Sequence, residues 1–235
     1  MTTGIRSVVT GAGRGLGLEF ARQLLARGDT VLAGCRAPAA ATALHALAAS
    51  SGGRLQVLPL DVADPASRAA FAAEVAARLP ALDLLVNNAG TMVSGERFGH
   101  VTQAAMTRSF AVNVAGPFLL AQALAPRLAA GTRPRVVGIG STMGSIARTS
   151  GFHAPSYSIS KAALNMATAL LAQALVPQGV GVLVLNPGWV RTAMGGASAP
   201  VAPADSVAGM LATIAAQPGV PAGEFLDHEG RPVPW

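Results

Sequence analysis

The chain has 235 residues, of which 51% are hydrophobic and 12% are charged, a balance typical of a folded domain and far from that of a disordered chain. Its net charge of +6 comes almost wholly from arginines scattered along the chain, with no basic stripe interleaved with aromatic residues. These features exclude nucleic-acid binding from the expected functions.

Cysteine usage and hydropathy predict a cytoplasmic protein. Cys35 is the sole cysteine, so it cannot form an internal disulfide, and a reducing compartment is the simplest interpretation. No apolar run reaches ~18 residues, and the N-terminus lacks the charged-then-apolar order of a secretory signal. The four histidines lie too far apart to suggest a metal site. We therefore expect no membrane span and no metal.

Apolar runs typical of buried strands alternate with helical patterns along the whole sequence. The expected strands cover residues 5–10, 30–34, 55–58, 82–86, 135–139, 180–185 and 224–227. The expected helices cover residues 16–26, 39–49, 65–79, 101–130, 156–175 and 204–216. Gly116-Pro117 predicts a break or kink within the longest of them.

This alternation predicts an α/β protein with a Rossmann-type, doubly wound, seven-stranded parallel sheet, helices on both faces and ligands at the carboxyl ends of the strands. A (β/α)₈ barrel is the competing architecture, but it usually needs ~250 residues and eight units. No repeat, linker or low-complexity segment divides the sequence, so we expect one domain over residues 1–235.

The first strand is followed by a glycine-rich turn, TGAGRGLG, at residues 10–17. It lies between a strand and a helix, where backbone N–H groups and the helix dipole can hold a pyrophosphate. The spacing is TGxxxGxG rather than the common GxGxxG, and glycines also serve tight turns that bind nothing. Its position after the first strand favours dinucleotide binding.

Tyr157 and Lys161 are the single tyrosine and the single lysine of the chain, and they lie four residues apart at the start of a predicted helix. Residues i and i+4 share one helix face, so an ammonium beside the phenol would favour the phenolate and lower the pKa of Tyr157. Tyr157 could then exchange a proton with a carbonyl or alcohol oxygen. The alternative is a tyrosine ring packed beside a snorkelling lysine stem.

Taken in order, the motifs resemble those of the short-chain dehydrogenase/reductase family over essentially the whole chain. Residues 10–17 match TGxxxGxG, residues 87–90 match NNAG, residues 157–161 match YxxxK, and residues 187–192 match PGxxxT. The resemblance implies the catalytic set Asn113, Ser141, Tyr157 and Lys161. Tyr157 would be the general acid/base, Ser141 would polarise the substrate oxygen, and Asn113 would hold a water that links Lys161 to solvent.

The resemblance also implies a cofactor site at the carboxyl edge of the sheet. Asn88 and Gly90 would line the adenosine side, and Asp61 would face the adenine ring. Asp61 could instead cap a helix, although Asp64 suits that role better, and Asn87 could tie neighbouring strands together. The full expected set is Thr10, Gly11, Arg14, Gly15, Leu16, Gly17, Arg36, Asp61, Val62, Asn88, Ala89, Gly90, Tyr157, Lys161, Pro187, Gly188, Val190 and Thr192.

The end of the second strand predicts which nicotinamide cofactor is preferred. An acidic residue there would accept from the adenosine ribose 2′-hydroxyl and repel a 2′-phosphate, but this chain has Gly34-Cys35-Arg36. Arg36 can bind a phosphate through its guanidinium fork, and Arg14 in the glycine turn is a second cation. The alternative is that these arginines are merely solvated, which applies more to Arg14 than to Arg36. We expect NADP(H) to be preferred, with NAD(H) as the second choice.

Residues 33–36, 160–166 and 225–235 are similar to the branch of the family that contains C-factor and sniffer-like carbonyl reductases. The segment after Thr192 is short, so residues 193–203 are expected to form an abbreviated substrate lid. Fifteen residues separate Ser141 from Tyr157, more than the resemblance leads us to expect. An apolar substrate pocket would be lined by Met143, Phe152, Trp189 and Met194, with His153 as one polar contact.

The resemblance implies an NADP(H)-dependent oxidoreductase that interconverts a ketone or aldehyde with an alcohol. It also implies a homodimer or homotetramer, which alanine-rich helices at 101–130 and 156–175 would allow, although alanine is abundant throughout. The alternative is an NAD(P)-binding signalling or regulatory protein of the C-factor type that needs no turnover. The complete catalytic set favours the enzyme, because a pure binder needs no acid at Tyr157.

Overall fold

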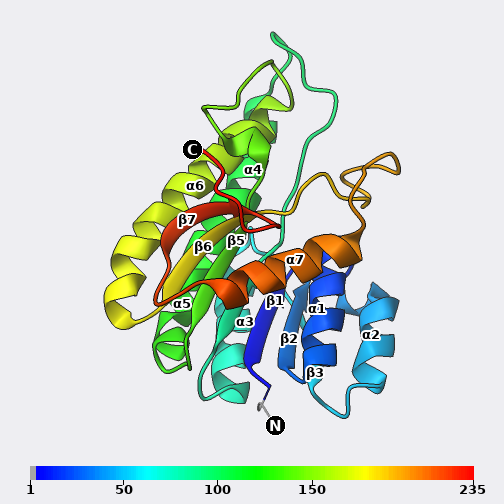
Figure 1. Cartoon of the computed structure of the whole chain (residues 1–235). Helices are drawn as coiled ribbons and strands as arrows, with labels where there is room; N and C mark the ends of the chain where they lie inside the picture. The colour runs from blue at the N-terminus through cyan, green and yellow to red at the C-terminus, as the bar shows by residue number, and fades with distance from the viewer. Residues whose placement is uncertain (1–3) are drawn as a thin grey trace.

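The computed structural model describes residues 4–235, which form a seven-stranded parallel sheet flanked by helices (Figure 1). The strands are β1 (Arg6–Thr10), β2 (Thr30–Cys35), β3 (Leu55–Pro59), β4 (Leu84–Asn87), β5 (Arg135–Ile139), β6 (Gly181–Asn186) and β7 (Ala222–Asp227). Their order is β3-β2-β1-β4-β5-β6-β7, so the winding reverses between β1 and β4. The predicted doubly wound sheet is confirmed, and ligands of such sheets bind beyond the carboxyl ends at this reversal.

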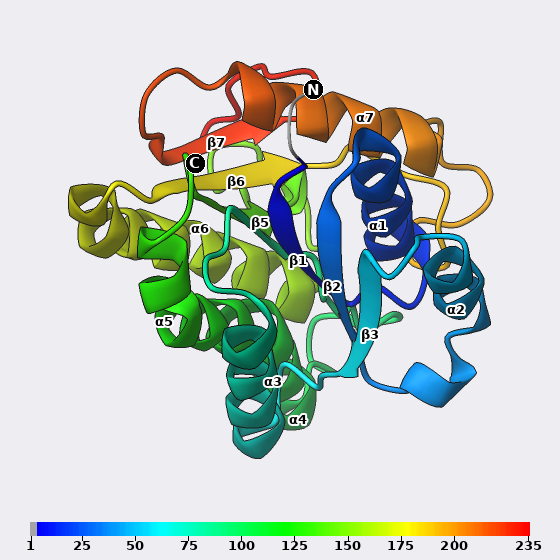
Figure 2. The same ribbon diagram turned by 90° about the horizontal axis from the view of Figure 1, so that it is seen from below.

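Helices cover both faces of the sheet, as Figures 1 and 2 show. One face carries α1 (Gly15–Arg27), α2 (Thr42–Ala49) and α7 (Pro203–Ala216), and the other carries α3 (Pro65–Arg78), α4 (Gln103–Phe110), α5 (Gly116–Ala129) and α6 (Pro155–Leu175). Each face has its own core because side chains alternate across a strand. Val9 and Val31 pack with α1, whereas Val8 and Leu32 pack with α3 and α5.

The predicted helix over 39–49 is wrong in its first turn. A short 3₁₀ turn at Pro38–Ala40 is followed by Ala41, whose ψ of 57° interrupts the helix before α2 begins at Thr42. Pro38 fixes the start of the 3₁₀ turn, and the high alanine content of this segment did not reveal the interruption at Ala41.

The predicted long helix begins at Gln103 instead of 101, and it does not break at Gly116-Pro117. A π-helical turn at Ala111–Ala115 joins α4 to α5 without interruption. Pro117 has no N–H to donate to the carbonyl of Asn113, and the wider π-helical turn lets the helix continue without this hydrogen bond. Asn113 therefore lies on an irregular turn of the helix, and irregular turns of this kind often lie at functional sites.

Two helical stretches, Gln103–Ala129 and Pro155–Gln178, are long and apolar enough by length and composition to suit a membrane span, and the expectation of no membrane span stays a prediction. Within the apolar 18-residue window of each stretch, 44% and 50% respectively is buried inside the protein. Leu120, Leu124 and Leu171 pack into the core beside the sheet. Packing on the sheet therefore accounts for the buried apolar residues of both helices.

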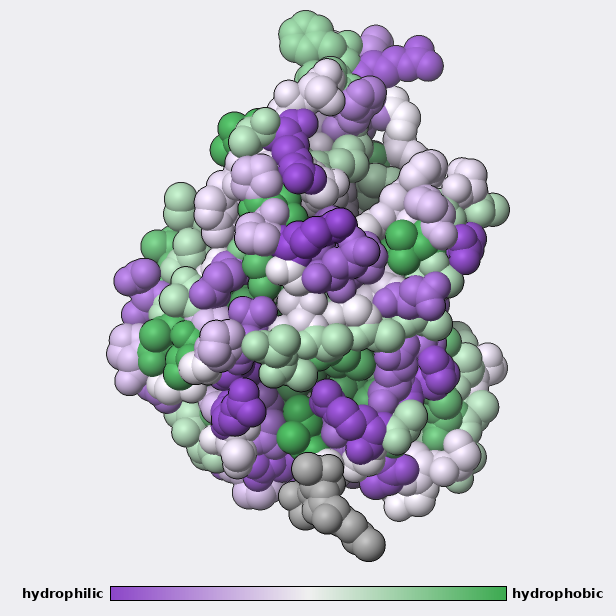
Figure 3. Space-filling model, viewed as in Figure 1, coloured by the Kyte–Doolittle hydropathy of each residue, from purple (hydrophilic) through white to green (hydrophobic). Residues whose placement is uncertain are grey.

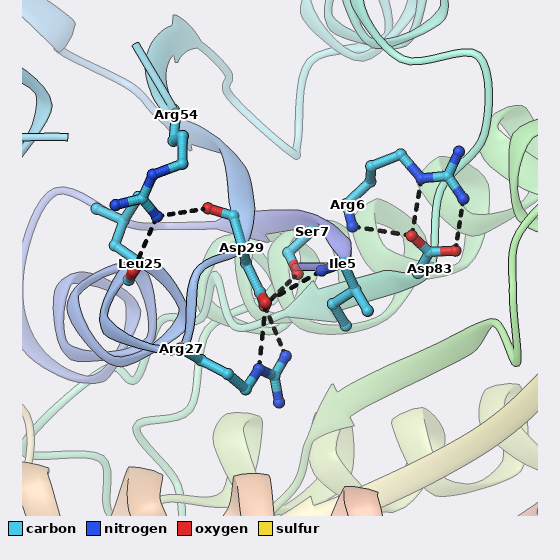
Figure 4. A network of polar contacts seen from close by, with 8 residues as sticks. All are labelled: Ile5, Arg6, Ser7, Leu25, Arg27, Asp29, Arg54 and Asp83. Atoms are coloured by element: carbon cyan, nitrogen blue, oxygen red, sulfur yellow. Dashed lines mark hydrogen bonds and ion pairs between the residues drawn. The ribbon is translucent and has the colours of Figure 1, made fainter. Parts of the chain in front are cut away.

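Buried carboxylates hold the amino-terminal edge of the sheet together (Figure 4). Asp83 accepts hydrogen bonds from the backbone N–H and from Nε of Arg6, both at 2.8 Å. Asp29 accepts from the Ile5 N–H at 3.2 Å and pairs with the Arg27 guanidinium at 2.6 Å. This charged network lies at the edge opposite to the carboxyl ends of the strands, so it serves stability rather than the site.

Candidate active site

The turn between β1 and α1 depends on three glycines, two for their backbone conformation and one for lack of space. Gly11 and Gly15 have φ values of +64° and +56°, in the left-handed region that favours glycine. A Cβ on Gly17 would lie 2.4 Å from the carbonyl oxygen of Gly11, whereas a Cβ on Gly13 would meet only the Cys35 Cβ at 3.5 Å. The turn needs the three glycines of TGxxxGxG, and the fourth is free to vary.

Helix α1 begins at this turn and presents its N-terminus to the carboxyl edge of the sheet. Neither a capping side chain nor an acidic residue lies in its first turn, which contains Leu16 and Gly17. The first N–H groups of α1 therefore lack a side-chain acceptor, and the helix dipole adds a positive potential. This end of the helix suits a pyrophosphate.

Thr10 and Asn88 tie the glycine turn to the end of β4. The Thr10 hydroxyl accepts from the backbone N–H groups of Asn88 and Ala89, each at 3.0 Å. The Asn88 amide donates to the carbonyls of Thr10 at 2.8 Å and of Gly11 at 3.2 Å. Asn87 is buried and donates to the Pro117 carbonyl at 3.4 Å, so it ties β4 to a helix rather than to a neighbouring strand.

The two arginines expected to select the cofactor lie at one corner of the site. Arg36 follows β2 directly, Arg14 precedes α1, and both side chains are exposed. Gly13 and Cys35 adjoin each other, which places the glycine turn beside the end of β2. Arg14 and Arg36 each directly follow one of these two residues, so both arginines belong to this corner of the site.

Asp61 and Val62 lie just beyond the end of β3. Asp61 is partly buried and accepts from the Ala63 N–H at 2.9 Å. Asp64 caps α3 by accepting from the Ser67 N–H at 2.7 Å, as its position in the sequence suggested. The Asp61 carboxylate is therefore not the cap of α3. Val62 is buried.

Tyr157 and Lys161 lie together near the start of α6, and both are buried, with 8% and 4% of their surfaces exposed. The Lys161 Nζ lies 5.5 Å from the centre of the Tyr157 ring and donates to the Ile139 carbonyl at 2.6 Å. The Lys161 ammonium has three N–H donors, and among residues 4–235 the Ile139 carbonyl accepts from one of them. A Cβ on Gly90 would lie 3.9 Å from the same Nζ, so the end of β4 passes directly beside it.

The electrostatics of this pair differ from the expected ones. Burial lowers the pKa of Lys161 to about 8, because its surroundings disfavour the charged form. Burial also raises the pKa of Tyr157, and contact with the Ser141 hydroxyl only partly opposes the rise. The expectation that Lys161 lowers the Tyr157 pKa is therefore wrong for this structure. The phenol stays protonated at neutral pH, which suits a proton donor.

The segment after β5 brings Ser141 against α6. A Cβ on Gly144 would lie 2.6 Å from the Lys161 carbonyl carbon, so the 3₁₀ turn Thr142–Gly144 packs directly on the backbone of α6. The Asn165 amide donates to the Gly144 carbonyl at 3.2 Å and fixes this contact. No local pattern indicates Gly144, because the requirement for a glycine at this position arises only where two distant segments meet.

Asn113 connects the end of β4 to α6. Its side-chain oxygen accepts from the Thr91 N–H at 2.8 Å, and its amide donates to the Thr91 carbonyl and to the Ser160 hydroxyl, both at 2.9 Å. Ser160 in turn donates to the Tyr157 carbonyl at 2.7 Å. Ser160 lies within the YxxxK motif, and the sequence analysis missed its structural role.

Residues 187–192 approach the glycine turn from the end of β6. A Cβ on Gly15 would lie 3.6 Å from the Thr192 methyl carbon, so these two motifs adjoin. The buried Ser206 hydroxyl donates to the Pro187 carbonyl at 2.7 Å and anchors the turn to α7. Gly188 has a φ of +80°, and Val190 is buried.

The residues expected to bind substrate lie on three segments around this edge. Met143 is partly buried in the turn after Ser141, whereas Trp189 and Met194 are 57% and 43% exposed. Phe152 is half exposed, and its ring packs edge-on against Phe98 at 5.7 Å, a partner that the sequence did not suggest. His153 is exposed. A substrate pocket formed by these residues stays a prediction.

Comparisons with known proteins agree with this geometry. A family model described as short chain dehydrogenase matches residues 6–201. The C-signal of Myxococcus xanthus is 41% identical over 154 residues, which cover 66% of this chain and 93% of that protein. An NADPH-bound carbonyl reductase from chicken fatty liver has a TM-score of 0.93 at 36% identity, covering 99% of this chain and 100% of that one. The carbonyl reductase Sniffer of D. melanogaster has a TM-score of 0.91 at 28% identity, with the same coverage.

Proposed function

This chain belongs to the short-chain dehydrogenase family, in the branch of C-factor and sniffer-like carbonyl reductases, and on this premise we propose that it reduces a ketone or aldehyde with NADPH and catalyses the reverse oxidation of the alcohol. The observation that carries the proposal is the buried pair of Tyr157 and Lys161, with Ser141 in contact with the phenol. The substrate is a small molecule, and its identity is left to experiment.

NADP(H) is the cofactor that the comparisons and the residues of the site support, and NAD(H) is the second choice. The glycine turn leaves no room for a side chain at Gly11 or Gly17, and the α1 N-terminus would hold the pyrophosphate. Arg36 and Arg14 would bind the adenosine 2′-phosphate, and the exposed position of both leaves them available to it. When bound, the nicotinamide supplies the hydride for reduction and accepts it for oxidation.

Proton transfer is assigned to Tyr157. Its raised pKa keeps the hydroxyl protonated, so it can donate to the carbonyl oxygen as the alcohol forms. Ser141 would donate a second hydrogen bond to the same oxygen and stabilise the charge that develops there. The donors of Lys161 that Ile139 does not use would bind the ribose, and the ammonium would stabilise the phenolate that Tyr157 becomes once it has donated its proton.

Asn113 would hold the water that connects Lys161 to solvent. Its side chain is already occupied by Thr91 and Ser160, so the carbonyl oxygen is the group that remains for a water. The π-helical turn and Pro117 support this role, because Pro117 cannot donate to the Asn113 carbonyl. Asn113 would therefore serve proton supply rather than contact the substrate.

A signalling protein that binds NAD(P) without turnover is the second candidate, favoured by the 41% identity to the C-signal of Myxococcus xanthus. We further propose a cytoplasmic homodimer or homotetramer. The α4–α6 face supports self-association, because Met106, Phe110 and Ile159 are exposed along it.

Fluorescence titration with NADPH and NADH, followed by absorbance at 340 nm with a panel of aromatic and aliphatic carbonyls, tests the proposal. Tight NADPH binding with carbonyl-dependent loss of absorbance would support the reductase. Tight binding without turnover on any carbonyl would favour the signalling protein, and failure to bind either nucleotide would overturn both candidates.

A further inference from the structure

Helix α6 carries both Tyr157 and Lys161, yet it lacks a cap from its own N-terminal residues. Ala154 stands at the N-cap position in the left-handed conformation, with φ +39° and ψ 60°, and an alanine side chain cannot accept a hydrogen bond. Pro155 has no N–H, so the first donor that requires an acceptor is the Ser156 N–H, one residue before Tyr157.

Glu96 supplies the missing cap from a segment 60 residues away in the chain. Its Oε2 accepts from the Ser156 N–H at 3.1 Å, and its Oε1 accepts a short hydrogen bond from the Ser156 hydroxyl. Ser156 is 2% exposed, and Glu96 is partly buried. A carboxylate at a helix N-terminus also interacts favourably with the helix dipole.

A second contact joins the same two segments. Phe98 packs edge-on against Phe152, with the ring centres 5.7 Å apart and the planes at 82°. Glu96 and Phe98 therefore hold two points of the unexpectedly long stretch between Ser141 and Tyr157. Figure 1 shows the loop after β4 and the loop before α6 rising side by side above the carboxyl edge, and Figure 3 shows that this end projects beyond the body.

The other end of that stretch is held by the C-terminal tail. The buried Ser145 hydroxyl donates to the Pro234 carbonyl at 2.6 Å, and the Ala147 N–H donates to the Trp235 carbonyl at 2.9 Å. The stretch is thus fixed near Ser141 by the tail and near Tyr157 by the segment over 91–101. Of these contacts, the one made by Glu96 is directly adjacent to Tyr157.

We propose that Glu96 is a positioning residue for Tyr157: by capping α6 it fixes the backbone that carries the phenol, and it fastens the loop after β4 over the site. This role rests on the proposed reductase function for its effect on turnover, whereas the cap itself does not depend on that function. A position error of about 1 Å at a reacting group can cost about a hundredfold in rate, so a loosened cap is expected to lower kcat.

The test compares Glu96→Ala and Glu96→Gln with the wild type, and uses Glu74→Gln as the matched control. Glu74 lies on α3, and among residues 4–235 its one ion-pair partner is Arg78. Loss of a helix cap corresponds to a change of about tenfold in a local equilibrium. We expect hydrogen exchange at 156–158 and at 91–101 in the NADPH-bound protein to accelerate about tenfold in Glu96→Ala and less in Glu96→Gln.

Turnover gives the second readout. In Glu96→Ala, kcat for the best carbonyl of the panel should fall about tenfold while the NADPH Kd stays within about twofold, and Glu96→Gln should recover part of the loss. Glu74→Gln should match the wild type in both assays. A loss of NADPH affinity in Glu96→Ala as large as its loss of kcat would overturn the positioning role, because it would indicate general damage to the fold.

The two proposals fail in different ways. Wild-type exchange rates in Glu96→Ala would overturn the cap, whatever the turnover. Faster exchange with an unchanged kcat in an active enzyme would overturn the positioning role. If the wild type binds NADPH but reduces no carbonyl, the reductase proposal fails, and with it the positioning role, while the exchange data still decide whether Glu96 caps α6.

Discussion

Gly13 and Gly17, four residues apart in the same turn, should differ greatly in their sensitivity to one added methyl group. A Cβ at position 17 would lie 2.4 Å from the Gly11 carbonyl oxygen and 2.5 Å from the Asn88 amide nitrogen, about 1 Å inside ordinary contact. A Cβ at position 13 would meet the Cys35 Cβ at 3.5 Å, which is ordinary contact. Gly13 also lacks a positive φ, so alanine fits its backbone.

Helix propensity alone predicts the reverse for Gly17, because alanine in a helix is favoured over glycine by about 1 kcal/mol. The clash should outweigh this gain, since relieving it moves the turn by about 1 Å and misaligns N–H groups whose hydrogen bonds to a phosphate contribute about 1.5–3 kcal/mol each. Gly17→Ala should therefore weaken NADPH binding about a hundredfold, and Gly13→Ala less than about threefold.

Fluorescence titration with NADPH measures both affinities, and thermal unfolding without nucleotide verifies that each variant folds. Gly17→Ala binding NADPH as tightly as the wild type would refute the assignment of the turn to the pyrophosphate. Equal losses in the two variants would refute the claim that only three of the four glycines are required.

Three further outcomes follow from charged groups. Carbonyl reduction should decline as the pH rises through about 8, where the buried Lys161 loses its proton, and the decline should be absent from the residual activity of Lys161→Arg, because arginine keeps its charge. Arg36→Ala should weaken NADPH binding about tenfold and leave NADH unchanged, since it removes one charge-assisted hydrogen bond to the 2′-phosphate; equal effects on both nucleotides would contradict that role. Burial opposes ionisation of Asp83, but hydrogen bonds from Arg6 hold its pKa below the usual value, so its stabilisation is present at neutral pH and is lost as the pH falls through that lowered pKa. Asp83→Asn should therefore cost about 2 kcal/mol of stability and lower Tm by about 4–8 °C at pH 7. A variant with the same Tm as the wild type at pH 7 would contradict this.

The parts of the fold that local pattern specifies were predictable from the sequence. Continuous apolar strands predicted the parallel sheet, and the spacing of Gly11, Gly15 and Gly17 predicted the turn. The single tyrosine and lysine indicated where chemistry would lie, because their spacing on one helix face is itself a local property.

What the sequence could not reveal depends on contacts between distant segments. The π-helical turn around Asn113, the need for Gly144 and the cap from Glu96 each arise where residues far apart in the chain meet. The expected direction of the Tyr157 pKa shift was also wrong, because burial is a property of the packed structure that the sequence does not reveal. Burial raises the pKa of Tyr157 and outweighs the neighbouring Lys161, whose own charged form is disfavoured there.

The central claim is that Tyr157 donates a proton to a substrate held beside NADPH, and Tyr157→Phe tests it most directly. The substitution removes one hydroxyl from a buried ring and leaves the cofactor-binding turn untouched. The NADPH-dependent rate with the best carbonyl should fall at least about a hundredfold, while the NADPH Kd changes by less than about threefold. A variant that keeps the wild-type rate would contradict the account, since no proton from Tyr157 would then be needed.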